Sequence, residues 1–189
     1  LSEITKIGDC ELDENIRPNS TMEKLNSLNL VFDQNGTVTA ATSSPLTDGA
    51  AATLICEENF AKENGLEILG RIKSTAVEGC DPNFMGLGPI VASKKALERA
   101  KLSIKDIDIV ELNEAFASQS LACIKDLDID INKVNLDGGA IALGHPLGAT
   151  GERITGKAAQ LLKRENKKYA LATQCIGLGM GIATVIEAV

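Results

Sequence analysis

Aromatic residues are scarce in this chain of 189 residues. They make up 3% of the sequence, tryptophan is absent, and Tyr169 is the single tyrosine. The core must therefore be built from alanine, valine, isoleucine and leucine, which a hydrophobic content of 44% can supply. That content, with 24% charged residues, is ordinary for a globular protein and excludes a disordered chain or a collagen-like repeat.

Basic clusters, metal-binding cysteine patterns and long apolar runs are missing as well. The net charge is −7 and no Lys/Arg block stands out, which argues against nucleic acid as a partner. No stretch approaches the roughly 20 apolar residues of a membrane span, so we expect no membrane partner. The five cysteines form neither a CxxC pair nor a zinc pattern, which favours a reducing, cytoplasmic compartment and no bound metal.

The first residue, Leu1, is not methionine, so the sequence reads as part of a longer chain. Its length suits one domain with a sizeable core, or two small domains. A missing N-terminus would also hide a targeting segment.

Strand and helix patterns alternate along the chain. Asn35-Gly36 between short β-prone runs predicts a hairpin over 31–39. Small apolar residues from 48 to 56 predict a buried helix that ends near 64–65. Further along, we expect strands over 66–71, 107–112, 169–173 and 180–186, a helix that begins at Pro89, a helix over 113–126, and one with the buried stripe Ile154, Ala158, Leu161 and Leu162. This alternation predicts an α/β layered fold in which a mixed, mainly buried sheet lies between helices.

Glycine is unusually concentrated near the C-terminus, where nine of the seventeen glycines lie between Gly138 and Gly181. The first part of this region, 138–151, holds His145, the single histidine of the chain. Glycines let the backbone approach a ligand closely, and the proline after His145 restricts its backbone. An acid–base or oxyanion role for His145 and a purely structural connection are equally compatible with this segment.

Two nucleotide-binding patterns can be set aside. Residues 151–158 imitate GxxxxGK, but Ala158 stands where a serine or threonine would bind magnesium, and the segment belongs to an amphipathic helix. No GxGxxG opens a βαβ unit, which disfavours a nicotinamide dehydrogenase.

Two further segments carry side chains suited to catalysis. Cys175 ends a predicted strand and is followed by alternating glycines, which suits a thiol acid–base group beside an oxyanion hole. The other four cysteines are interpreted as small buried residues. Asn113 follows another predicted strand, where it can cap a helix or orient a water or carbonyl.

In this order and spacing, the segments Asn113–Phe116, Gly144-His145-Pro146 and Cys175–Gly181 strongly resemble the thiolase family. Further matches extend the resemblance over essentially the whole chain: Asp13–Pro18, Asn35–Ala40, Ser43-Ser44, Asp48–Ala52 and Met85–Pro89. The resemblance implies a thiolase-like layered fold and an acyltransferase that condenses two acyl-CoA thioesters or cleaves a 3-ketoacyl-CoA through a cysteine nucleophile.

The resemblance also implies roles for individual residues. Cys175 corresponds to the acid/base cysteine that moves the α-proton of acetyl-CoA. Asn113 would hold a water that, with His145, stabilises the thioester or enolate oxygen, and His145 would help to activate the nucleophile. The backbone N–H of Gly177 would contribute to a second oxyanion hole. The positions that match CoA-binding residues are Arg17, Phe32, Ser44, Met85 and Phe116, with CoA thioesters as substrates and no permanently bound cofactor.

One departure from the family matters most, because none of the five cysteines stands in the context of the nucleophile. The chain thus resembles a carboxyl-terminal half: 1–47 as the end of a CoA-facing loop region, 48–69 as the last helix and strand of the first domain, and 70–189 as a complete second domain. We expect it to be inactive without the missing N-terminal half. Smaller departures are Ala41-Thr42 and Leu178.

Several functions remain open. We expect a short-chain acetyl-CoA acetyltransferase that forms a homo-dimer or homo-tetramer. The alternatives are a degradative 3-ketoacyl-CoA thiolase of broader chain length, a non-catalytic thiolase-like binding subunit, and an unrelated α/β protein that binds ATP or NAD.

Overall fold

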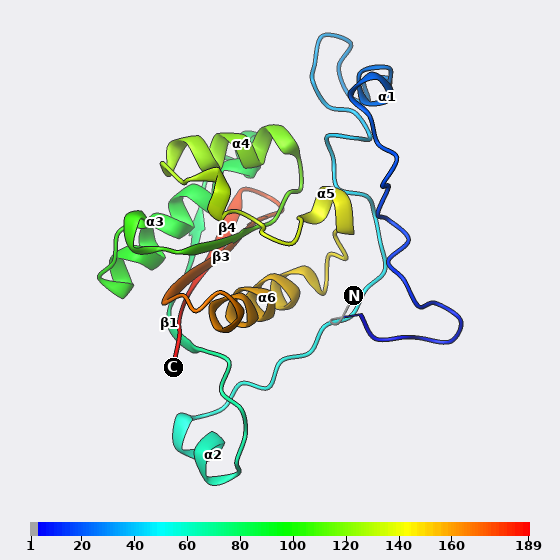
Figure 1. Cartoon of the computed structure of the whole chain (residues 1–189). Coiled ribbons are helices and arrows are strands. Elements are labelled where there is room, and N and C mark those ends of the chain that lie inside the picture. Colours follow the sequence, from blue (N-terminus) through cyan, green and yellow to red (C-terminus); the bar gives the residue numbers. More distant parts are fainter. Residues whose placement is uncertain (1–3) are drawn as a thin grey trace.

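A four-stranded sheet forms the centre of the computed structural model, which describes residues 4–189 (Figure 1). Its strands are β1 (Arg71–Gly79), β2 (Ile109–Leu112), β3 (Tyr169–Ile176) and β4 (Met180–Glu187), in the order β1-β4-β3-β2. β4 pairs antiparallel with both of its neighbours, whereas β2 runs parallel to β3. The mixed sheet expected from the sequence is confirmed.

Helices cover both faces of this sheet (Figure 1). α3 (Gly88–Ala100) and α4 (Ala117–Asp126) lie on one face and α6 (Thr150–Arg164) lies on the other. The predicted apolar stripe of α6 is confirmed, because Ile154, Ala158, Leu161 and Leu162 are all buried against the sheet. The helix predicted to begin at Pro89 is also confirmed, beginning one residue earlier.

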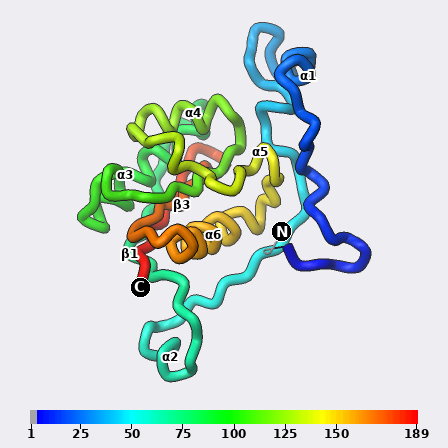
Figure 2. Tube along the Cα trace, viewed as in Figure 1, coloured from blue at the N-terminus to red at the C-terminus, as the bar shows by residue number. Residues whose placement is uncertain are grey.

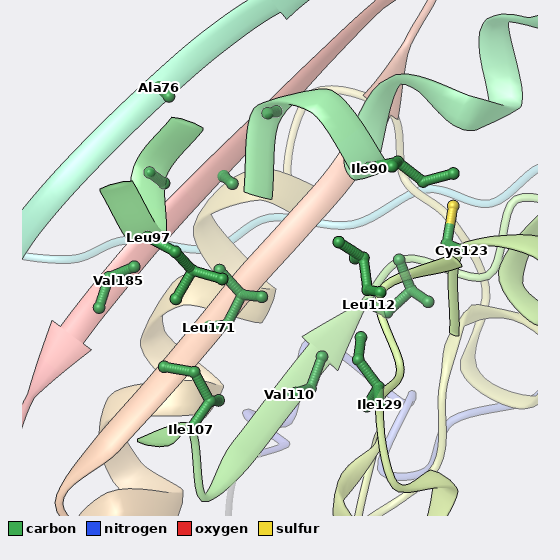
Figure 3. Packing of buried hydrophobic residues seen from close by; sticks show 14 of the residues in the cluster. Ala76, Ile90, Leu97, Ile107, Val110, Leu112, Cys123, Ile129, Leu171 and Val185 are labelled. Atoms are coloured by element: carbon green, nitrogen blue, oxygen red, sulfur yellow. The ribbon is translucent and has the colours of Figure 1, made fainter. Parts of the chain in front are cut away.

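The strand residues alternate between two aliphatic cores. Val110 and Leu112 of β2 point toward α3 and α4, where Leu97, Leu171 and Val185 complete the larger core (Figure 3). Ile109 points the other way and packs beneath α6. Because both faces of β2 are covered, all four of its residues are buried although it is an edge strand.

Short elements connect these layers. They are α1 (Met22–Asn26), α2 (Glu58–Glu63), α5 (Ala140–Leu143) and the 3₁₀ helices η1 (Pro82–Leu87), η2 (Ile104–Asp106) and η3 (Ile131–Lys133). The helix predicted over 113–126 begins only at Ala117, with Phe116 as its N-cap residue. Asn113 is therefore not a helix cap; its backbone N–H donates to the Thr173 carbonyl of the neighbouring strand at 3.0 Å.

The N-terminal part departs most from the sequence-based expectation. It runs largely outside the sheet layers, as the blue and cyan part of Figure 2 shows. The predicted hairpin over 31–39 is reduced to a turn: Gly36 N donates to the Asp33 carbonyl at 2.9 Å and Val31 N to the Val38 carbonyl at 3.0 Å, but no strands flank it.

The buried helix predicted from residue 48 to near 64–65 is wrong over its first part, whereas its predicted end matches α2, whose C-cap residue is Asn64. Residues 50–56 have no regular secondary structure and are exposed, and only the six residues of α2 are helical in this region. The strand predicted over 66–71 is wrong as well, since β1 begins at Arg71. A short apolar helix gains its stability from packing, and here no layer covers the segment.

In the part of the chain from residue 4 onward, no helix combines the length and apolar composition needed to cross a bilayer.

Candidate functional site

The candidate residues gather at the carboxyl ends of the parallel strands β2 and β3. Asn113 follows β2 directly, and Cys175 is near the end of β3. α5 leads into His145, and α6 begins five residues after that histidine. In open α/β sheets this edge is where ligands bind.

A chain of hydrogen bonds fixes the imidazole of His145. The Thr150 hydroxyl donates its single proton to the Pro146 carbonyl at 3.0 Å, so it accepts from Nδ1–H of His145 at 2.6 Å. Nε2 then accepts from the Asn113 side-chain amide at 3.4 Å. This tautomer is assigned from the hydrogen-bond network. It leaves a basic nitrogen, Nε2, facing Asn113.

The surroundings of His145 favour its neutral form. Burial lowers the pKa of the imidazole, and the positive charge of Arg153 on α6 lowers it further. A neutral histidine can accept a proton, and an imidazolium formed at this place can return it readily.

Asn113 is completely buried between strand and helix. Its Nδ2 contacts His145, whereas its Oδ1 has no hydrogen-bond partner among residues 4–189. A buried amide oxygen without a partner loses its hydration without compensation, so it is an acceptor available to a ligand group.

The segment from Pro45 to Gly49 holds the His145 loop from the other side. The backbone N–H of His145 donates to the Pro45 carbonyl at 3.3 Å, and Leu46 forms a parallel bridge with His145. Gly49 leaves room for the Pro146 ring, because a Cβ there would lie 2.7 Å from its Cγ. Residues about a hundred positions apart in the sequence thereby meet beside His145.

Cys175 lies in β3 opposite Gly181 of β4, and its thiol is partly buried. Burial raises the pKa of this thiol, and the nearby Cys80 adds to the effect. Gly177 lies in the turn beyond the last paired residues, Ile176 and Met180. Among residues 4–189, no hydrogen bond joins the Cys175 thiol to His145 or Asn113, so these groups share a strand edge without direct contact.

Three of the five candidate CoA-binding residues lie together. The rings of Phe32 and Phe116 meet edge to face with centroids 6.5 Å apart. Ser44 donates from both its backbone N–H and its hydroxyl to the carbonyl of Ala115, the residue before Phe116.

The other two candidates lie in different segments of the chain. Met85 lies in η1, next to Gly86, whose carbonyl accepts from the Cys123 thiol of α4. Arg17 lies in the exposed segment before α1.

Two residues that anchor the site were not predicted. Thr150 orients the imidazole ring, and Asn135 bonds both the strand before Asn113 and the side chain after it. Thr150 belongs to the glycine-rich segment 138–151, and nothing in that segment indicates its bond to His145. Asn135 precedes the glycines of the 138–151 segment. This position predicts a turn, but it does not indicate that the Asn135 side chain bonds to Leu112 and Glu114.

No group of three or more His, Cys, Asp or Glu side chains suited to a metal ion occurs within residues 4–189. All five cysteines of the chain are unpaired.

Two family models match this chain. The model of the thiolase C-terminal domain matches residues 66–188, and that of the thiolase N-terminal domain matches residues 3–59. The chain belongs to the thiolase family.

Its curated relatives include proteins named 3-ketoacyl-CoA thiolase. One from Vibrio vulnificus is 59% identical over 179 residues, which are 93% of this chain and 46% of the relative. One from Pseudoalteromonas translucida is 58% identical over 183 residues, 95% of this chain and 47% of the relative. The chain therefore spans about half the length of the relatives it matches.

Two solved structures share the fold of this chain. Human mitochondrial 3-ketoacyl-CoA thiolase in complex with CoA is 47% identical with a TM-score of 0.89, covering 95% of this chain and 46% of that one. Bacillus anthracis acetyl-CoA acetyltransferase is 44% identical with a TM-score of 0.91, and the match covers 98% of this chain and 48% of that one.

Proposed function

We propose that this chain supplies the C-terminal half of the acyl-transfer site of a 3-ketoacyl-CoA thiolase. The observation that carries the proposal is the hydrogen-bonded series Asn113–His145–Thr150 at the strand edge that also carries Cys175. It provides a base, an oxygen-binding amide and a thiol within one part of the fold.

His145 would activate the nucleophile. In thiolysis, the sulfur of a cysteine from the N-terminal half bonds to the C3 carbonyl carbon of the 3-ketoacyl-CoA, while its proton passes to Nε2 of His145. The Nε2–H formed in this way then donates to the thioester oxygen of the substrate, on which the negative charge of the enolate develops. Asn113 would hold a water that donates to the same oxygen, and the available Oδ1 of its buried amide supports this role.

Cys175 would move the second proton. When the C2–C3 bond breaks, the acetyl-CoA enolate takes a proton from the Cys175 thiol. The resulting thiolate takes the proton of the incoming CoA thiol, whose sulfur displaces the enzyme cysteine, and that cysteine recovers its proton from His145. The raised pKa of the Cys175 thiol supports a proton donor that is fully protonated at neutral pH. The backbone N–H of Gly177, outside the strand ladder, would stabilise the second oxyanion.

We further propose that CoA binds along Phe32, Ser44, Met85 and Phe116, with Arg17 near its phosphates. The contact between Phe32 and Phe116 supports an apolar wall for the pantetheine arm. The overall acidity of the chain is no obstacle, because recognition of phosphates needs only local cations.

The domain organisation expected from the sequence remains part of this proposal: 1–47 a CoA-facing region, 48–69 the end of the first domain, and 70–189 the second domain. The nucleophilic cysteine would come from the N-terminal half, so the chain alone would be inactive. A homo-dimer or homo-tetramer in the cytoplasm completes the proposal, and the unpaired state of all five cysteines supports a reducing compartment.

The names of the curated relatives favour a 3-ketoacyl-CoA thiolase over the short-chain acetyl-CoA acetyltransferase that we expected from the sequence. The similarity to the Bacillus anthracis acetyl-CoA acetyltransferase keeps the short-chain enzyme as the second candidate. Thiolysis rates over a series of 3-ketoacyl-CoA chain lengths separate the two: activity confined to acetoacetyl-CoA would favour the second.

The experiment that tests the proposal is complementation. The chain is produced together with the N-terminal half of a bacterial 3-ketoacyl-CoA thiolase, and CoA-dependent thiolysis is followed for the pair and for the chain alone. We expect activity from the pair only, and its loss by at least about a thousandfold in Cys175→Ala. The matched control is Cys10→Ala, at an exposed cysteine outside the site.

Activity of the chain alone would contradict the requirement for the other half. Full activity of the Cys175→Ala pair would contradict the acid–base role. A folded pair that binds CoA but turns nothing over would favour the non-catalytic subunit.

A further inference from the structure

We propose that Asn135 and Glu114 are positioning residues that together fix the Asn113 amide and the His145 imidazole relative to each other. This inference rests on the proposed acyl-transfer role of those two groups. Neither Asn135 nor Glu114 is assigned a role by the family resemblance above.

Asn135 completes the pairing of the edge strand β2 with its own side chain. Its backbone N–H donates to the Val110 carbonyl at 2.8 Å, which brings it alongside the strand. Its Oδ1 accepts from the backbone N–H of Leu112 and its Nδ2 donates to the Leu112 carbonyl, both at 2.9 Å. The side-chain amide thus replaces the peptide group of a further strand. It fixes the backbone of the residue immediately before Asn113.

The second proton of Nδ2 extends the network past Asn113. It is donated to Oε1 of Glu114 at 3.0 Å, so both N–H groups of the Asn135 amide are used. Asn135 is nearly fully buried, which makes each of these bonds costly to lose. The residues on both sides of Asn113 are therefore held by one amide.

Glu114 carries the network to the histidine loop. Its Oε2 accepts from the backbone N–H of Ile141, in the first turn of α5, at 3.1 Å. The N-cap residue of this helix is Gly139, which has no side chain to offer, and a Cβ there would lie 2.2 Å from the Glu114 carboxyl carbon. The glycine thus lets a distant carboxylate cap the helix. α5 has four residues and leads through Gly144 directly to His145.

The network matters because the direct contact is weak. The 3.4 Å separation between Asn113 Nδ2 and His145 Nε2 is long for a hydrogen bond, so it cannot by itself hold the two groups in register. A misplacement of about 1 Å at a catalytic group can cost about a hundredfold in rate. The bonds from Asn135 through Glu114 to Ile141 restrict the relative positions of Asn113 and His145.

The test reads the imidazole directly, since the chain has a single histidine. Asn135→Asp keeps the shape of the side chain but removes both Nδ2 donors and places a carboxylate against Glu114. We expect its ¹⁵N and ¹H imidazole signals to shift or broaden in NMR spectra of the 189-residue chain. The matched control is Asn132→Asp on η3, where the asparagine is exposed and its amide donates only to Asp130. We expect it to leave those signals in place.

A double variant supplies the rescue. With Asn135→Asp and Glu114→Gln combined, the new glutamine can still accept from Ile141 N and can donate to the new aspartate. The link between positions 135 and 114 re-forms with reversed polarity, and only the bond to the Leu112 carbonyl stays lost. We expect the imidazole signals to return toward their original positions. Should Asn135→Asp fail to fold, Glu114→Gln alone carries the same NMR readout, because an amide has a single acceptor oxygen and cannot accept from both Asn135 Nδ2 and Ile141 N.

Unchanged imidazole signals in these single variants, with only a lower Tm, would overturn the proposal in favour of a merely structural role. Signals that move without return in the double variant would also overturn it. In the complemented pair, we expect kcat to fall about ten- to a hundredfold at unchanged KM. Signals that move and return while the unsubstituted pair shows no thiolysis would contradict the proposed function and leave the positioning network standing.

Discussion

Glu111 is a carboxyl group buried in the strand β2. It follows Ile109 by two residues along β2 and therefore points toward the same helix, α6, and it is 1% exposed. Burial raises the pKa of its side chain to about 7, although Arg153 and Lys157 act in the opposite direction. Glu111 precedes Asn113 by two residues, so a proton bound to its carboxyl group is close to the proposed site.

Glu111 makes stability depend on pH in a direction opposite to most carboxylates. Its ordinary value is 4.5, so the folded chain binds this proton more tightly than the unfolded chain. The stabilising contribution is complete below about pH 4.5 and is lost as the pH rises through about 7. In Glu111→Gln this loss is absent. We therefore expect the variant to gain up to about 3 kcal/mol in free energy of unfolding relative to the original chain between pH 5 and pH 8.

Urea denaturation at several pH values measures this difference. Glu63→Gln, at an exposed position of α2, is the matched control and should run parallel to the original chain. Parallel curves for Glu111→Gln as well would contradict the expectation.

At the scale of elements, α3 is pressed onto β4 through two glycines. A Cβ on Gly181 would lie 2.1 Å from the carbonyl carbon of Gly88, and a Cβ on Gly88 would lie 2.2 Å from the Met180 carbonyl oxygen. The start of the helix thus lies directly on the strand residue that pairs with Cys175. This close approach sets the distance between helix and sheet at the candidate site.

Gly181→Ala should push α3 away from the sheet. We expect a loss of about 3 kcal/mol in free energy of unfolding, because backbone atoms rather than flexible side chains block the added methyl group. Thermal or urea denaturation of the chain measures the loss. Gly148→Ala, where nothing lies within 4 Å of the added carbon, is the control and should cost far less. A cost for Gly181→Ala no larger than that of the control would refute the close approach.

The elements differ in how far the sequence predicts them. The helices α3 and α6 were predicted because each buries a stripe at helical spacing, and β3 and β4 because they are long apolar runs between turns. α5 was missed because four residues carry no periodicity and its cap, Glu114, comes from another part of the chain. β1 was missed because its burial pattern as a partly exposed edge strand is irregular. Asn113 was placed correctly after a strand. Its contact with His145 could not be predicted from local sequence, because the two residues lie far apart along the chain.

At the scale of the whole molecule, the structure divides into a packed layered part and an N-terminal part that is largely exposed. In the latter, Leu54 and Ile55 are 71% and 69% exposed, although the sequence of this segment suits a buried helix. Propensity alone did not form that helix, because short helices need tertiary packing. The local sequence pattern therefore identified an apolar segment but wrongly predicted that this segment is helical and buried.

Hydrogen exchange can follow this segment. In the chain alone, we expect amides of residues 50–56 to exchange rapidly and those of β3 and β4 to be protected. When the N-terminal half of a thiolase is added, protection should appear in 50–56, because the added half would cover the exposed apolar side chains. Protection of 50–56 in the chain alone, or none in the pair, would contradict this expectation.

The side chain of Asn135 has a second consequence, for solubility. An edge strand presents a row of unpaired N–H and C=O groups, which invites strands of other chains and so promotes aggregation. On β2, Asn135 takes up the outer peptide groups of Leu112, and its backbone N–H takes up the Val110 carbonyl. That edge is therefore closed to intermolecular strand addition. A substitution at Asn135 would both loosen the site and uncover a strand on which the chain could polymerise.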